Sequence, residues 1–170
     1  MNMAFLILRL VLGTAMAAHG AQKLFGWFGG HGLKGTGRFM EQLGFSPGPR
    51  FALAAGLGEL GGGGLLALGL FGPVGPALVI MVMVVAMATV HRGHGFFAMT
   101  NGAELPLLYI TGALAALFGG PGAYSLDAML GLNPHWTPAV QWASLGAAGV
   151  LALGNLAVRR TPHPTEAASA

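Results

Sequence analysis

The sequence predicts an all-α membrane protein, a polytopic bundle of transmembrane helices. Of its 170 residues, 54% are hydrophobic and only 8% are Asp, Glu, Lys or Arg. An ordinary soluble domain carries about 25% charged residues, so this chain has too little charge to cover a surface in water. Five long apolar runs follow one another, without the polar–apolar alternation of membrane barrel strands. The composition also excludes a disordered chain and a basic arm for nucleic acid.

The first expected span covers residues 3–22, for which the competing interpretation is a cleaved secretory signal. No basic residue precedes this run, and Arg9 lies inside it, which disfavours a signal. We therefore expect a retained helix that ends near His19 and Lys23.

Prolines mark the starts of the next two spans. The second covers residues 51–71, after Pro47 and Pro49, and the third covers residues 74–90, after Pro73. Proline suits the start of a helix, because the first-turn N–H groups have no partner within the helix.

The connection between the first two spans is long and rich in glycine. Residues 26–37 contain too many glycines for a regular helix, whereas residues 36–45 can form an amphipathic turn or two. Such a segment either lies in the plane of the lipid headgroups or closes over the end of the bundle.

The fourth expected span, residues 103–118, has a polar start. Asn101 is expected to act as its N-cap, with Glu104 in the first turn. The fifth span covers residues 138–158 and ends at two arginines. The remaining residues, 161–170, are expected to be disordered.

Basic residues alternate between the connections. The first connection, the third connection and the segment after the fifth span contain all that lie outside the spans: Lys23, Lys34, Arg38, Arg50, Arg92, Arg159 and Arg160. Cytoplasmic connections are the ones enriched in Lys and Arg. The pattern predicts an N-terminus outside and a C-terminus in the cytoplasm.

Many of the 30 glycines lie inside the expected spans. Gly13 with Ala17, and Gly58 with Gly62, form pairs of small residues four positions apart. Such pairs allow helix backbones to approach closely in a membrane. We expect packing to explain most of these glycines.

Ionisable residues inside the spans need a reason, because inserting one costs about 2.5–3.5 kcal/mol. At 100° per residue, Arg9, His19 and Lys23 share one face of the first helix. Glu59 is expected about 13 Å deep on the antiparallel second helix, between Arg9 and His19. It would pair with Arg9, with His19, or with both through water. The arrangement is either an ion pair that fixes helix register or a polar pocket for a small ligand that exchanges protons.

Two residues of the fourth span, Glu104 and Tyr109, are further candidates for the pocket wall. Helix capping by Glu104 and simple packing by Tyr109 are the alternatives. His19 and His91 at similar depth raise haem or another metal as a minor alternative, but we expect no metal. The chain has no cysteine, which excludes thiolate ligands, disulfides and thiol redox chemistry.

Five short segments follow one another along the chain in an order that can be compared with known families. They are Arg9-Leu10, His19 to Gly26, Gly56 to Gly62, Asn101 to Tyr109 and Gly120 to Asp127. Together, over about residues 4–130, they resemble the DoxX family of small bacterial membrane proteins. The resemblance implies a four-helix membrane bundle in the bacterial inner membrane and a part in membrane redox chemistry. Its matching polar positions are Arg9, His19, Lys23, Glu59 and Glu104.

The resemblance also divides the chain. Residues 1–130 are expected to form the four-helix core, residues 131–160 an extra transmembrane helix, and residues 161–170 a tail. The fifth span lies beyond the family core.

The leading hypothesis is a membrane subunit of a quinone-linked oxidoreductase or oxidative-stress system. Glu59 and His19 are the candidate catalytic residues, Glu59 as the proton carrier. Arg9 and His19 would hydrogen-bond a quinone carbonyl, and Lys23 would attract an anionic group at the cytoplasmic mouth. Glu104 and Tyr109 complete the candidate binding residues.

Under this hypothesis a quinone is the cofactor, bound without a covalent link. The partners are the lipid bilayer, a soluble oxidoreductase that supplies electrons, and a second copy of the chain. The alternatives are a non-catalytic scaffold that anchors a soluble oxidoreductase, and a transporter of a small solute.

Overall fold

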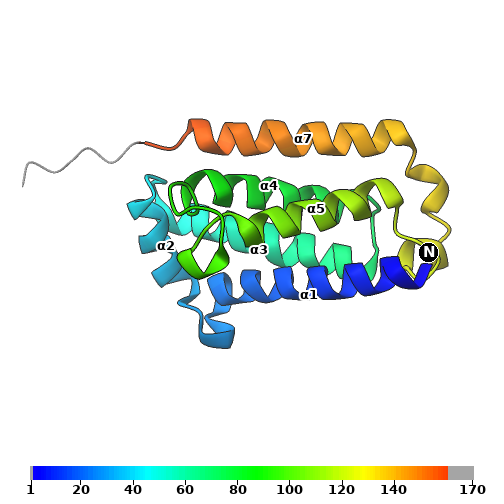
Figure 1. The fold of residues 1–170 in the computed structure, drawn as a ribbon, viewed down its shortest axis with the longest axis horizontal. Helices are drawn as coiled ribbons and strands as arrows, with labels where there is room; N and C mark the ends of the chain where they lie inside the picture. Colours follow the sequence, from blue (N-terminus) through cyan, green and yellow to red (C-terminus); the bar gives the residue numbers. More distant parts are fainter. Residues whose placement is uncertain (1, 161–170) are drawn as a thin grey trace, which may run out of the picture.

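The computed structural model describes residues 2–160, and every regular element within that range is helical (Figure 1). The five long helices are α1 (Asn2–Phe25), α3 (Gly48–Leu68), α4 (Val74–Thr89), α5 (Glu104–Gly119) and α7 (Pro138–Ala157). The connections contain α2 (Gly32–Gln42), α6 (Leu126–Met129) and three single turns of 3₁₀-helix, η1 (Trp27–Gly29), η2 (Ala98–Thr100) and η3 (Asn133–His135). The prediction of an all-α bundle is confirmed. The expected disordered tail lies outside the described residues.

The five expected spans coincide with these five long helices. By length and composition α1, α3 and α7 can cross a membrane, whereas α4 and α5 are apolar but shorter, with 16 residues each. Sixteen residues extend about 24 Å, somewhat less than the hydrocarbon core of about 30 Å.

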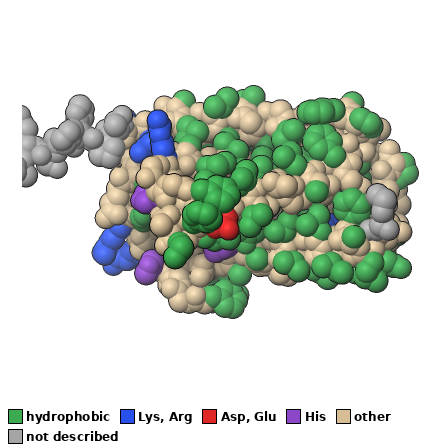
Figure 2. All heavy atoms as spheres, viewed as in Figure 1, with side chains coloured by type: hydrophobic (Ala, Val, Ile, Leu, Met, Phe, Trp, Pro, Cys, Tyr) green, Lys and Arg blue, Asp and Glu red, His purple; other side chains and the backbone are tan. Residues whose placement is uncertain are grey.

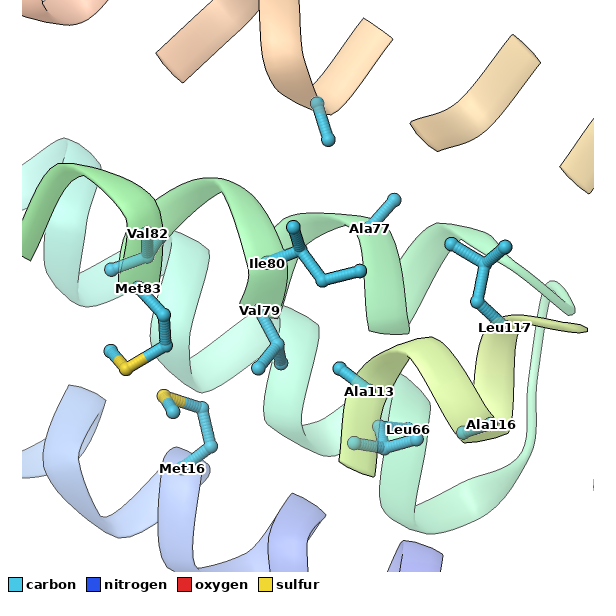
Figure 3. Packing of buried hydrophobic residues seen from close by; sticks show 11 residues of the cluster. Met16, Leu66, Ala77, Val79, Ile80, Val82, Met83, Ala113, Ala116 and Leu117 are labelled. Carbon is cyan, nitrogen blue, oxygen red and sulfur yellow. The ribbon is translucent and has the colours of Figure 1, made fainter. Parts of the chain in front are cut away.

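The order of packing follows the chain. α1 packs along α3, α3 against α4, and α4 against α5, while α7 lies on the outside against α4 (Figure 1). Met16 of α1 and Met83 of α4 meet between the helices, and Val79 and Leu66 continue the buried layer (Figure 3). Only Ala148 and Ala152 of α7 are buried, so this helix leaves most of its surface to lipid.

Glycine residues allow the backbones of α1 and α3 to approach each other closely. A Cβ atom added at Gly63 would lie 2.5 Å from the backbone oxygen of Gly13 and from the backbone nitrogen of Ala17. A Cβ at Gly20 would similarly overlap the backbone of α3 at Leu60. The two helices are therefore in backbone contact, as the glycine pattern predicted for packing.

Seven of the eight Lys and Arg residues lie at one end of the bundle, here called the basic end. Figure 2 shows Lys and Arg side chains gathered at that end and hydrophobic side chains along the rest of the visible face. The basic end is formed by the last turns of α1, α4 and α7, by α2, and by the start of α3. Its residues are Lys23, Lys34, Arg38, Arg50, Arg92, Arg159 and Arg160.

The glycine-rich connection departs from expectation. Residues 32–42 form α2, although three glycines lie within it, so the prediction that residues 26–37 form no regular helix is wrong over this part. Thr36 and Gly37 are buried because α2 packs against α3 and α1. Tertiary packing thus compensates for the weak helix propensity of glycine. The helix lies over the end of the bundle, which is one of the two positions expected for residues 36–45.

Candidate functional site

A cavity of about 400 Å³ opens inside the basic half of the bundle. Helices α1, α3, α4 and α5 form its walls, α2 covers it, and Asn155 of α7 reaches it from outside. Its polar and ionisable lining residues are His19, Lys23, Glu59, Thr89, His91, Asn101, Tyr109 and Asn155. Four of the six residues predicted for the site, Glu59, His19, Lys23 and Tyr109, are thus brought together, whereas Arg9 and Glu104 are not in the lining.

The charged centre of the cavity is an ion pair between α1 and α3. Lys23 Nζ donates to both carboxylate oxygens of Glu59, at 2.7 Å and 2.6 Å. The Glu59 side chain is 3% exposed and that of Lys23 is 26% exposed, so Lys23 links a buried carboxylate to the outside of the bundle. Because an ammonium has three N–H donors, one remains available after both bonds are made.

His19 lies next to this pair and faces Tyr109 of α5. The two rings meet edge to face, with centroids 6.2 Å apart. Gln22 Nε2 donates to the carbonyl of Phe28 at 3.1 Å, which fixes the orientation of the Gln22 amide. The amide oxygen then accepts a hydrogen bond from the N–H at His19 Nδ1, at 3.1 Å. In the neutral tautomer that carries this N–H, Nε2 is a hydrogen-bond acceptor.

A second histidine, His91, lines the cavity beyond the end of α4. Its Nδ1 donates to the carbonyl oxygen of Asn101 at 2.8 Å. Among residues 2–160, no three His, Asp or Glu side chains come together in a way that would hold a metal ion.

The rest of the cavity wall is apolar and was not predicted from the sequence. Phe39 and Met40 of α2 contribute to it, as do Leu43, which directly follows α2, and Met81 and Met83 of α4. The cavity extends around α4, so residues on more than one face of that helix reach it.

Arg9 does not pair with Glu59, which corrects the expected arrangement. It is 2% exposed and lies at the opposite end of the bundle. Its guanidinium donates to the carbonyl of Ala67 at 3.3 Å and to that of Tyr124. Arg9 therefore joins α1 to the end of α3 and to the connection that follows α5.

Asp127 completes this second polar cluster, and the sequence reasoning missed its role. Its carboxylate accepts the backbone N–H groups of Phe71 and Gly72, at 2.9 Å and 2.6 Å. Asp127 lies in α6, and its fully buried carboxylate reaches the turn that joins α3 to α4. Its place in the Gly120 to Asp127 segment was the available signal. The cluster satisfies backbone groups that would otherwise lack partners.

Glu104 begins α5, but the expected cap does not form. The N-cap position is Ala103, while Asn101 ends the preceding 3₁₀ turn with a left-handed backbone. The Glu104 carboxylate accepts the N–H of Ala98 at 2.7 Å, which ties the α4–α5 connection to the start of α5.

The fold and the cavity define a class: a polytopic membrane bundle with a buried lysine–carboxylate pair facing a largely apolar cavity. A family model described as DoxX matches residues 4–92, just over half of the chain, and the chain belongs to this family. The matched region contains α1 to α4. An uncharacterized protein of Haemophilus influenzae is 36% identical over 104 residues, which cover 56% of this chain and 78% of that protein. No solved structure matches.

Proposed function

We propose that this chain is the quinone-binding membrane subunit of a redox system. The observation that supports it is the Lys23–Glu59 pair, which faces a cavity with mostly apolar walls beside His19 and Tyr109. A volume of about 400 Å³ falls within the range of small-molecule sites, about 300–1,000 Å³. A quinone suits such a site, because its ring is apolar and its two carbonyl oxygens need hydrogen-bond donors.

The residues divide the chemistry between them. The spare N–H of Lys23 and the hydroxyl of Tyr109 would donate to a quinone oxygen. Reduction to the quinol takes up two electrons and two protons. Glu59 and His19 would pass the protons on from the basic end, and a soluble oxidoreductase would supply the electrons. Arg9 has no part in this scheme, since it lies in the other polar cluster.

We further propose that the basic end faces the cytoplasm. The arrangement of seven Lys and Arg residues supports this orientation. After Arg160, a fused reporter that works only in the cytoplasm is expected to be active, and one that works only in the periplasm is expected to be inactive. Periplasmic reporter activity would contradict the proposed orientation.

Quinone content after mild purification tests the proposed site. Wild-type protein from native-like membranes is expected to carry about one quinone per chain, and Glu59→Gln about tenfold less. The reason is the loss of a charge-assisted hydrogen bond that positions Lys23, worth about 1.5–3 kcal/mol. The measurement is extraction and chromatography at matched protein amounts.

Glu104→Gln is the matched control, since it changes a carboxylate at the basic end that does not line the cavity. It is expected to retain the wild-type quinone content. If neither wild type nor variant carried quinone, and Glu59→Gln were merely less stable, the pair would be structural. The scaffold alternative, with a soluble oxidoreductase anchored to the bundle, would then replace the proposal.

A further inference from the structure

A second, smaller cavity of about 190 Å³ lies between α4 and α7. It is a groove whose walls include Leu78 and Met81 of α4 with Ala147 and Leu151 of α7. Ser144 also lines it, but its hydroxyl donates to the carbonyl of Val140 at 2.8 Å and so is satisfied within its own helix. The groove therefore offers an occupant almost only apolar surface.

The groove and the main cavity share one lining residue, Met81 of α4. The groove extends from Met81 along α4 to Val74, about 10 Å of helix. That direction leads away from the basic end and toward the opposite end of the bundle, where α4 begins. Leu151 is 57% exposed, so the groove is open to the surrounding lipid.

We infer that the ligand is amphipathic: its ring, with the two carbonyl groups, occupies the main cavity and an apolar tail occupies the α4–α7 groove. This inference rests on the proposed function and specifies the substrate class as a quinone with a long hydrocarbon tail. The charged and aromatic polar side chains lie in the main cavity, whereas the one polar side chain that lines the groove, Ser144, is satisfied within its own helix. An amphipathic molecule matches this order, with its ring near the basic end and its tail toward the opposite end of the bundle.

Binding of two probes in nanodiscs of fixed lipid composition tests the inference. The first is a dimethoxymethylbenzoquinone without a tail, and the second is the same ring with a decyl tail. Ala147→Phe, which fills the groove, is expected to weaken binding of the decyl probe about tenfold, the equivalent of about two buried methylene groups. Binding of the tail-less probe is expected to stay within about twofold of wild type.

Val150→Phe is the matched control, because Val150 lies at nearly the same depth on α7 and is 70% exposed outside the groove. It is expected to leave both affinities unchanged. Tail partition into the bilayer is the same for all variants, so it cancels in the comparison.

A photoreactive decyl probe with a diazirine at the tail end gives an independent readout. Labelling is expected on α4 and α7 peptides and should fall when excess tail-less quinone is added. Labelling that this competitor does not reduce would assign the groove to bilayer lipid and overturn the inference. If both probes bound wild type but Ala147→Phe did not weaken binding of the decyl probe, the inference would be overturned while the proposed function would stand. Failure of both probes to bind wild type would overturn the proposed function and the inference with it.

Discussion

Replacing Glu59 with leucine is expected to lower the free energy of unfolding by about 3 kcal/mol. Lys23 would keep its charge in the cavity wall but lose the carboxylate that both of its short bonds reach. Breaking a buried pair by removing one partner costs about 3–5 kcal/mol. The lower end applies here because Lys23 is 26% exposed. Denaturant unfolding in mild detergent, followed by circular dichroism, measures the change.

The double variant Lys23→Met, Glu59→Leu is the control for this result. Removing both charges leaves no unpaired group, so most of the lost stability should return. A double variant as unstable as Glu59→Leu would show that packing around Glu59, and not the unpaired ammonium, caused the loss. Recovered stability without recovered quinone would separate the pair's structural role from its binding role.

Gly63→Ala is expected to destabilise the bundle by about 2–3 kcal/mol, although alanine is the better helix former. The added Cβ would lie 2.5 Å from two backbone atoms of α1, which cannot rotate away as a side chain can. The two helices must move apart, and overpacking of this kind costs about 1–3 kcal/mol, occasionally more. Thermal unfolding in a fixed detergent measures the effect.

The neighbouring glycine supplies the comparison. Nothing lies within 4 Å of a Cβ added at Gly64, so Gly64→Ala should be neutral or stabilise by up to about 1 kcal/mol. Equal destabilisation by both substitutions would mean that loss of glycine itself, and not the contact with α1, is responsible.

The helices could be predicted closely because long apolar runs bounded by proline and charge leave few alternatives. The α4 prediction, residues 74–90, differs from Val74–Thr89 by one residue. The convergence of Glu59 with His19 and Lys23 was also within reach, because helical periodicity assigns residues to a face. The start of α2 was missed, because local propensity says nothing about the surface of α3 that supports it.

The partner of Glu59 was wrong for a reason of register. The depth expected for Glu59 relative to Arg9 and His19 assumes that the end of α1 and the start of α3 lie at the same level in the membrane. Gly20 in fact lies beside Leu60, so Glu59 is level with the last part of α1. The start of α3 extends beyond α1 and packs against α2. The axial offset between α1 and α3 is set by how the two helices pack against each other, and it cannot be read from the residues of either helix alone.

The separation of the two polar clusters has a consequence for energy conversion. Arg9 and Asp127 lie at one end, Lys23 and Glu59 at the other, and the buried side chains of Met16 and Leu66 lie between them. Under the proposed function, protons for a reaction at Glu59 would therefore be supplied from one side of the membrane. Turnover at such a site would consume protons on that side without pumping them across. Any contribution to the membrane potential would depend on which side the electron donor releases its own protons.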